Sequence, residues 1–397
     1  MVLLGTLKDA PIKNGTRVVV RADFDVSLNG GEIEDDLRIQ RVVPTLKFIL
    51  SKGGFVRIIS HVGRPGGRRV KKLEMRIVAN RLEKLLKKKI VFVSDPLSSK
   101  NLVKYNRRRE IIFFENIRFW KGEENNDIIF AKKLSRWGNL FVNEAFAASH
   151  RNHATVALLP KLLPSFAGLN LEKEVYYLST LMKKPLRPFV AILGGAKLET
   201  KMPLVERFLK NADRVVMGGA LANQAFYLKG LPIGKSPVGV VFEKSRILRA
   251  LKSRKLYLPA DLVVSGSRDK ASRITIRLPD RVRGNEYIVD VGPVTVKSFI
   301  ALCHDAKTIV WNGPLGLTEL KRFARGTVDF ARGLAGIRAL KIVGGGDTLT
   351  ALRKYKLLSG FTFVSTGGGA MLDFLAGKKL PGIEILKRQA TSDKRHG

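Results

Sequence analysis

The chain has 397 residues, of which 45% are hydrophobic and 27% are charged, a composition typical of a globular protein. This length is too great for one compact core and predicts two domains. The single cysteine, Cys303, excludes an internal disulfide bond. The N-terminus lacks the basic region of a signal peptide, and no uninterrupted apolar run reaches membrane-spanning length. We therefore expect a cytoplasmic protein that makes no membrane contact.

The charge balance is strongly basic, because 72 Lys and Arg against 34 Asp and Glu give a formal net charge of +38. Such a surplus is typical of proteins that bind nucleic acid, anionic membranes or small anions, or of a general basic bias. The basic runs at 68–72, 87–89 and 107–109 are scattered and do not alternate with aromatic residues. They indicate solvated surface, with weak, non-specific nucleic-acid binding left open.

The first half of the chain alternates apolar runs of strand length with helical patterns. Strands are expected at 17–22, 56–60, 90–93, 111–114 and 140–143. One helix is expected to end at Gly53, and another to span about 75–88. Pro44 fits the first turn of the former helix, which leaves Arg38 in the loop ahead of it.

Cationic side chains follow several of these strands. The carboxyl ends of parallel strands share one edge of a sheet, so such side chains are expected to converge on one crevice. Arginine suits an anion there, because its planar fork donates two parallel hydrogen bonds to phosphate or carboxylate. The group comprises Arg38, His61, Arg64, Arg118 and Arg151. The pair His150 and His153 lacks a Cys or a third His and does not define a metal site.

A helix is expected over 169–183, and the two prolines after it mark a domain boundary. Beyond it the chain repeats one unit, an apolar strand followed by glycines. Such strands, alternating with helices, predict a parallel sheet covered on both faces, and the glycines let backbone approach a ligand closely. The repeats are FVAILGG at 189–195, RVVMGG at 214–219, TIVWNGP at 308–314, LKIVGGGD at 340–347 and FTFVSTGGG at 361–369.

The first repeat continues into a helix that carries Lys197 and Lys201 one turn apart. The first amides of a helix are unpaired and its dipole is positive there, so this segment predicts a phosphate site. Two lysines at this spacing also fit a solvated helix face. Asp347, directly after three glycines, is the carboxylate expected to face Mg²⁺ beside phosphates. No Walker or dinucleotide motif is present.

Several longer motifs occur in order along both halves. They are RADFDV at 21–26, DDLRI at 35–39, SHVGRP at 60–65, ENIRFWKGEE at 115–124, VNEAF at 142–146, SHRNHA at 149–154, GGAKLETK at 194–201, VDVGP at 289–293, WNGPLG at 311–316, GGGDT at 344–348 and STGGGA at 365–370. In these motifs and in their order, the chain resembles the phosphoglycerate kinase family from end to end.

The resemblance implies an α/β protein with two doubly wound parallel-sheet domains that face a central cleft. Residues 1–168 would bind 3-phosphoglycerate or 1,3-bisphosphoglycerate, and residues 185–374 would bind ATP or ADP with Mg²⁺. The helix at 169–184 would act as a hinge, and residues 375–397 would return to the N-terminal domain. The family expectation is a cytoplasmic, glycolytic monomer.

The resemblance also implies the site residues. For the glycerate substrate they are Asp23, Asp25, Arg38, His61, Arg64, Arg118 and Arg151. For the nucleotide they are Lys197, Lys201, Gly219, Asn312, Glu319, Gly345, Gly346, Asp347 and Thr348. In this pattern Glu319 holds the ribose and Asp347 lies beside the metal. Arg38 and Lys201 are the groups expected to stabilise the phosphoryl group in flight.

The implied reaction transfers a phosphoryl group reversibly between 1,3-bisphosphoglycerate and ADP, in line and after hinge closure. The acceptor in the reverse direction is a carboxylate that is already ionised at neutral pH, so no general base is expected. A non-catalytic, basic RNA-binding protein on the same scaffold is the alternative hypothesis, and only the net charge supports it.

The chain departs from the family pattern at several positions. Asp25 replaces the usual Asn, which we expect to weaken glycerate affinity by adding a negative charge. Ala220 replaces a glycine near the adenine, and Thr318 replaces an aromatic residue next to Glu319. The preference for one nucleotide base is therefore left open.

Overall fold

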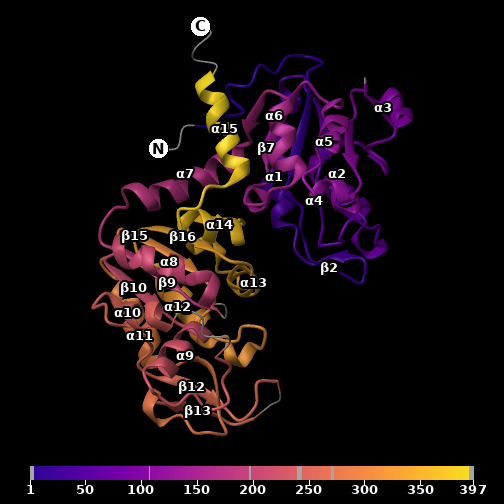
Figure 1. The fold of residues 1–397 in the computed structure, drawn as a ribbon. Helices are drawn as coiled ribbons and strands as arrows, with labels where there is room; N and C mark the ends of the chain where they lie inside the picture. The colour runs from indigo at the N-terminus through magenta and orange to yellow at the C-terminus, as the bar shows by residue number, and fades with distance from the viewer. Residues whose placement is uncertain (1–3, 107, 196–197, 239–243, 270–271, 393–397) are drawn as a thin grey trace. The chain divides into compact units, whose positions relative to one another are not determined.

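The computed structural model describes residues 4–106, 108–195, 198–238, 244–269 and 272–392 (Figure 1). The chain divides into two compact units. Unit 1 comprises Met1–Tyr176 and Lys378–Gly397, and unit 2 comprises Tyr177–Gly377. Among the described residues, no helix is both long and apolar enough to cross a membrane.

Unit 1 is built on a parallel sheet with the strand order β5-β6-β4-β1-β7-β8. Its strands are β1 (Arg17–Ala22), β4 (Phe55–Ile59), β5 (Ile90–Val93), β6 (Ile111–Phe114), β7 (Leu140–Glu144) and β8 (Ser165–Ala167). The first five lie within a residue of the predicted strands. A short hairpin, β2 (Leu28–Asn29) with β3 (Glu32–Ile33), turns at two glycines with positive φ angles.

Helices cover both faces of this sheet. The helices of unit 1 are α1 (Leu37–Ser51), α2 (Arg76–Leu86), α3 (Ser99–Tyr105), α4 (Lys121–Glu124), α5 (Ile128–Ser135), α6 (Leu159–Leu162) and α15 (Pro381–Ser392), with short turns η1 (Lys71–Leu73), η2 (Ile117–Phe119), η3 (Phe146–Ala148) and η4 (Ala154–Leu158). Val18 and Val20 of β1 pack in one apolar cluster with α1 and α2, and Val19 packs in another with α5. Alternate residues of one strand thus bury opposite faces, as a doubly wound sheet requires.

The start of α1 corrects one prediction. Arg38 was expected in a loop ahead of the helix, but α1 spans Leu37–Ser51 and contains Pro44 in its interior. An interior proline costs about 3 kcal/mol, because it removes a hydrogen bond and crowds the preceding turn. Ile39 and Leu46, one on each side of it, are completely buried, and each contributes about 1.5–3 kcal/mol. Burial therefore outweighs the proline, and Arg38 lies in the first helical turn.

Unit 2 is built on a second parallel sheet, with the strand order β11-β10-β9-β15-β16-β17. Its strands are β9 (Phe189–Leu193), β10 (Arg214–Met217), β11 (Leu256–Tyr257), β15 (Thr308–Asn312), β16 (Leu340–Gly344) and β17 (Phe363–Ser365). All five predicted strand-and-glycine repeats fall in this sheet. The predicted fold class, two α/β units with parallel sheets, is confirmed.

The remaining elements of unit 2 are helices and a small second sheet. The helices are α8 (Leu198–Asn211), α9 (Gly219–Leu228), α10 (Lys244–Leu251), α11 (Pro293–Cys303), α12 (Arg325–Ala335), α13 (Gly346–Lys354) and α14 (Gly369–Leu375), with η5 (Pro279–Arg281), η6 (Lys321–Phe323) and η7 (Leu358–Gly360). The second sheet is antiparallel, in the order β13 (Ile274–Arg277), β12 (Leu262–Ser265), β14 (Tyr287–Val291). It was not anticipated from the sequence.

The helix α7 (Leu169–Lys183) contains the division between the units. The amide of Leu169 donates to the hydroxyl of Thr45 (2.9 Å), and the next two amides donate to the carboxylate of Glu144 (2.9 and 3.1 Å). Burial raises the pKa of Glu144 to about 7. The unpaired amides at the start of α7 are thus satisfied by residues of α1 and β7, which anchor this helix end in unit 1.

Candidate functional site

A cluster of cations lies at the carboxyl edge of the sheet of unit 1. Arg38 comes from the first turn of α1, His61 lies two residues after the end of β4, and Arg118 lies in η2 after β6. Arg118 donates to the carbonyl of Gly63 (2.8 Å). Burial and then the charge of Arg21 lower the pKa of His61, and the charges of Arg118 and Arg38 lower it further. The structure therefore brings together a residue from the first turn of α1 and residues that follow two strands, β4 and β6.

Asp23 holds Arg38 in this cluster. Oδ2 of Asp23 accepts a hydrogen bond from Nη1 of Arg38 (2.5 Å), and this carboxylate is the main cause that raises the pKa of Arg38. Oδ1 of Asp23 is buried and has no hydrogen-bond partner in the described part of the chain. The side chain of Arg38 is still 26% exposed, so part of its guanidinium can reach a ligand.

His61 is buried and neutral. Nη2 of Arg21 lies 3.0 Å from Nδ1 of His61. A guanidinium only donates, so Nδ1 accepts and the ring proton resides on Nε2. Burial, and then the charge of Arg21, hold the pKa of His61 well below its usual value. At neutral pH, His61 therefore offers one N–H donor, whose nitrogen lies 3.8 Å from Oδ2 of Asp25.

Arg21 is a site residue that the sequence analysis missed. Its guanidinium is completely buried at the end of β1, where it donates to the hydroxyl of Thr155 (2.9 Å) and to His61. Glu123 lies 4.0 Å away and is also buried. Burial lowers the pKa of Arg21 while Glu123 opposes this effect. The available signal was a second arginine inside the apolar strand RVVVRA.

Arg64 lies in the loop after β4, next to Gly63, and Arg151 lies in the segment after η3. Both side chains are exposed, and neither forms a hydrogen bond or an ion pair within the described residues. Burial lowers the pKa of His153 to about 4, and the charges of Arg118, Arg21 and Arg151 contribute to this shift. The described residues contain no group of three or more His, Cys, Asp or Glu that could hold a metal.

In unit 2 the glycine loops approach one another closely. The amide of Gly195, after β9, donates to the carbonyl of Pro314, after β15 (2.8 Å). A Cβ atom at Gly219, which opens α9, would lie 2.8 Å from the nitrogen of Gly195 and from the oxygen of Pro314. Only glycine fits there, so the loops after three strands form one backbone surface.

Lys201 lies beside this surface. It is 7% exposed, and its Nζ donates to the carbonyl of Gly194. Burial lowers the pKa of Lys201 to about 8, and Asp347 opposes this shift. Lys197 was predicted to act with Lys201, but it lies outside the described residues.

The loop after β16 leads into α13, whose first residues are Gly346 and Asp347. Gly345, directly before them, has a φ angle of +100°. The buried hydroxyl of Thr348 accepts a hydrogen bond from the amide of Gly313 (2.9 Å), which ties this helix start to the β15 loop. Free amides and the helix dipole favour an anion at this helix start.

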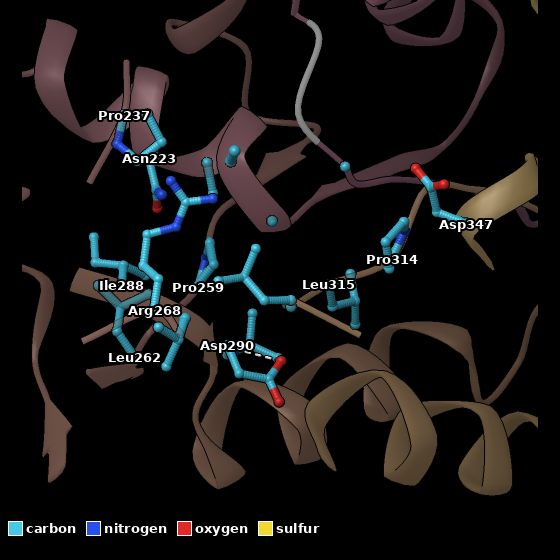
Figure 2. A pocket seen from close by; sticks show the side chains of 18 of the residues that line it. Asn223, Pro237, Pro259, Leu262, Arg268, Ile288, Asp290, Pro314, Leu315 and Asp347 are labelled. Carbon is cyan, nitrogen blue, oxygen red and sulfur yellow. Dashed lines mark hydrogen bonds between the residues drawn. The ribbon is translucent and has the colours of Figure 1, made fainter. Parts of the chain in front are cut away.

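A pocket extends along these loops within unit 2 (Figure 2). Gly219, Glu319 and Asp347 from the predicted nucleotide site line it. Asn312, also predicted, is buried next to the pocket loops, with its Nδ2 atom 3.9 Å from the sulfur of Met371. The other lining residues are Gly195, Ala220, Ala222, Asn223, Pro237, Pro259, Leu262, Arg268, Ile288, Val289, Asp290, Val291, Pro314, Leu315, Gly316 and Leu317.

The fold and these sites define a class, an α/β protein with two parallel-sheet units that each carry a site suited to phosphorylated anions. A family model described as phosphoglycerate kinase matches residues 7–378. The phosphoglycerate kinase of Coprothermobacter proteolyticus is 42% identical over 390 residues, covering 96% of this chain and 98% of the relative. That of Borreliella afzelii is 39% identical over 389 residues, covering 96% and 99%.

Solved structures of phosphoglycerate kinases also match this chain. The phosphoglycerate kinase from Coxiella burnetii matches with a TM-score of 0.84 at 36% identity, covering 98% of this chain and all (100%) of that one. The enzyme from Pyrococcus horikoshii OT3 matches with a TM-score of 0.86 at 28% identity, with the same coverage. The chain belongs to the phosphoglycerate kinase family, and the predicted enzyme class is confirmed.

The pKa of Lys201 predicts an alkaline limit to catalysis. The cationic form of this lysine is lost as the pH rises through about 8. We expect kcat/KM for ATP to fall about tenfold per pH unit above that value. An arginine stays charged at this pH, so the pH profile of Lys201→Arg should lack this limb, whatever its absolute rate. The same alkaline fall of kcat/KM in the wild type and in Lys201→Arg would show that the titrating group is not Lys201.

Proposed function

We propose that this chain transfers a phosphoryl group reversibly between 1,3-bisphosphoglycerate and ADP, giving 3-phosphoglycerate and ATP. The observation that carries the proposal is the presence of two separate anion sites, a cationic cluster in unit 1 and a glycine-lined pocket in unit 2. A magnesium-dependent, monomeric and cytoplasmic enzyme is part of the same proposal.

The glycerate substrate binds to the cluster in unit 1. Arg38 and Arg118 are held by protein groups and retain donors for its phosphate and carboxylate, and the exposed Arg64 and Arg151 add further charge. His61 donates through Nε2 to an oxygen of the substrate. Asp23 orients Arg38 through its hydrogen bond. Arg21 donates to Nδ1 of His61 and so keeps the ring proton on Nε2.

The nucleotide binds in the pocket of unit 2. Its phosphates lie against the glycine loops and the start of α13, where Gly345, Gly346 and Thr348 supply backbone amides, while the hydroxyl of Thr348 holds the β15 loop in place. Lys197 and Lys201 neutralise phosphate charge. Glu319 holds the ribose hydroxyls, and Asn312 supports the loop after β15.

Asp347 fits a magnesium ion. Its carboxylate is exposed, lines the pocket and stands at the phosphate-binding helix start, and magnesium prefers one or two carboxylates together with phosphate oxygens. When bound, the ion neutralises phosphate charge and orients the transferred group. Asp347 would hold it.

Transfer needs positioning and charge stabilisation but no general base. In the reverse direction the acceptor is the carboxylate of 3-phosphoglycerate, which is already ionised at neutral pH. The phosphoryl group moves from the acyl oxygen of 1,3-bisphosphoglycerate to a terminal oxygen of ADP. Arg38 and Lys201 stabilise the charge that spreads over its oxygens. Closure about residues 169–184 brings the substrates together and excludes water, with the first turn of α7 anchored to Glu144.

Steady-state consumption of ATP with 3-phosphoglycerate and magnesium tests this function. We expect wild-type turnover, and a loss of roughly 10³-fold or more in Lys201→Ala because a cation at the transferred phosphate is removed. Lys210→Ala, an exposed lysine of the same helix, is the matched control and should retain activity. Folded wild-type protein without turnover would overturn the proposal and favour the RNA-binding hypothesis.

Asp25 should weaken the binding of the glycerate substrate. Its Oδ1 accepts a hydrogen bond from the amide of Gly63 (2.8 Å), a bond that an asparagine also forms. Asp25→Asn therefore removes one negative charge without changing shape, and we expect the KM for 3-phosphoglycerate to fall about fivefold. Asp127→Asn, a similar change at the cap of α5, is the control. An unchanged KM in Asp25→Asn would refute this role.

A further inference from the structure

We propose that Asn116 is a positioning residue for the glycerate substrate. Its side-chain amide fixes both the loop that carries His61 and Arg64 and the turn that carries Arg118. The inference deepens the proposed function and rests on it, because it takes the cationic cluster of unit 1 as the glycerate site. Asn116 belongs to the motif ENIRFWKGEE at 115–124, in which the resemblance assigns a role to Arg118 alone.

The side chain of Asn116 is completely buried between β6 and η2. Its amide forms three hydrogen bonds, all of them to backbone groups. Nδ2 donates to the carbonyls of Val62 (2.8 Å) and Leu73 (3.0 Å), and Oδ1 accepts from the amide of Arg118 (3.2 Å). Only this orientation of the amide satisfies all three groups, since the opposite one would place its oxygen against two carbonyls.

These three hydrogen bonds join three segments of unit 1. Val62 lies in the loop after β4, Leu73 ends η1, and Arg118 lies in η2. A buried carbonyl without a donor is costly, so this point in the fold requires a group that donates twice. A neutral side chain that donates twice and also accepts is an amide, which accounts for an asparagine here.

The loop after β4 is held at two consecutive residues. The carbonyl of Val62 accepts from Asn116, and the carbonyl of Gly63 accepts from Nη1 of Arg118 (2.8 Å). The amide of Gly63 donates to Oδ1 of Asp25 (2.8 Å). The φ angle of Gly63 is +65°, a conformation that favours glycine. The backbone of this loop therefore follows one fixed path.

The substrate-binding residues depend on this path. His61 and Arg64 directly flank the two held residues. The exposed side chain of Arg64 forms no hydrogen bond or ion pair within the described residues, so the loop backbone sets where its guanidinium can reach. Arg118 depends on Asn116 twice, because Asn116 binds its amide and also fixes the loop to which its guanidinium donates.

Glu115 holds the backbone of Asn116 in place. Oε1 of this buried carboxylate accepts from the amides of Asn116 (2.8 Å) and Met75 (2.7 Å). These contacts do not involve the side chain of Asn116. A changed side chain at this position is therefore expected to release the loop after β4 while the backbone of residue 116 keeps its place.

Steady-state kinetics of Asn116→Ser test the inference. A serine can still accept from the amide of Arg118, as capping serines do, but it is too short to reach the carbonyls of Val62 and Leu73. We expect kcat/KM for 3-phosphoglycerate to fall about 10- to 100-fold, because the binding groups lose their alignment. The KM for ATP should stay within about twofold, because the nucleotide site lies in unit 2.

Asn116→Asp adds a pH-dependent readout. At neutral pH its carboxylate would oppose both carbonyls and lower kcat/KM for 3-phosphoglycerate. Burial raises the pKa of such a carboxyl, and its protonated form can again donate to one carbonyl. The deficit relative to the wild type at the same pH should therefore shrink at least about threefold from pH 8 to pH 6.

Asn101→Asp is the matched control. Nδ2 of Asn101, in α3, also donates to a backbone carbonyl, that of Asp95 (3.0 Å), but it lies outside the cationic cluster. This variant should keep kcat/KM for 3-phosphoglycerate within about twofold of the wild type at both pH values.

The two Asn116 variants separate positioning from a purely structural role. An equal loss toward ATP and 3-phosphoglycerate, together with a lower unfolding temperature, would overturn the inference, as would variants that match the wild type. Should one variant fail to fold, the other decides by the same readouts. If the wild type turns over and the variants match it, only this inference fails. If the folded wild type does not turn over, the proposed function fails and this inference fails with it.

Discussion

Parallel strand pairing is the constraint on which both candidate sites depend. In each unit all strands of the main sheet point the same way, so every following loop emerges at one edge. In unit 1 this edge collects Arg38, His61 and Arg118 from segments far apart in the sequence. In unit 2 it collects glycine loops and helix starts, whose free amides favour anions. The same constraint thus yields two phosphate-binding surfaces of different chemistry.

The cluster in unit 1 concentrates positive charge, and the protein stabilises its buried and its exposed cations differently. The buried guanidinium of Arg21 is offset by the buried carboxylate of Glu123, and the adjacent His61 stays neutral and adds no further charge. The exposed Arg64 and Arg151 are left for a ligand to neutralise. An anionic substrate would therefore neutralise the positive charge that remains on this surface.

The sequence predicted the strands well because each contains a short, mostly apolar run, and β1, β5 and β6 match their predicted ranges residue for residue. The start of α1 was wrong because the local preference of proline was outweighed by burial on both sides of it. Arg21 was missed because its role depends on Thr155, which lies 134 positions later.

Calorimetric binding of 3-phosphoglycerate and ADP to the wild type, Arg38→Ala and Lys201→Ala tests the central claim, that each unit carries its own anion site. The account predicts that Arg38→Ala loses at least about tenfold in affinity for 3-phosphoglycerate while keeping ADP, and that Lys201→Ala does the reverse. If either variant loses both ligands alike, or if Arg38→Ala binds 3-phosphoglycerate like the wild type, the account is contradicted.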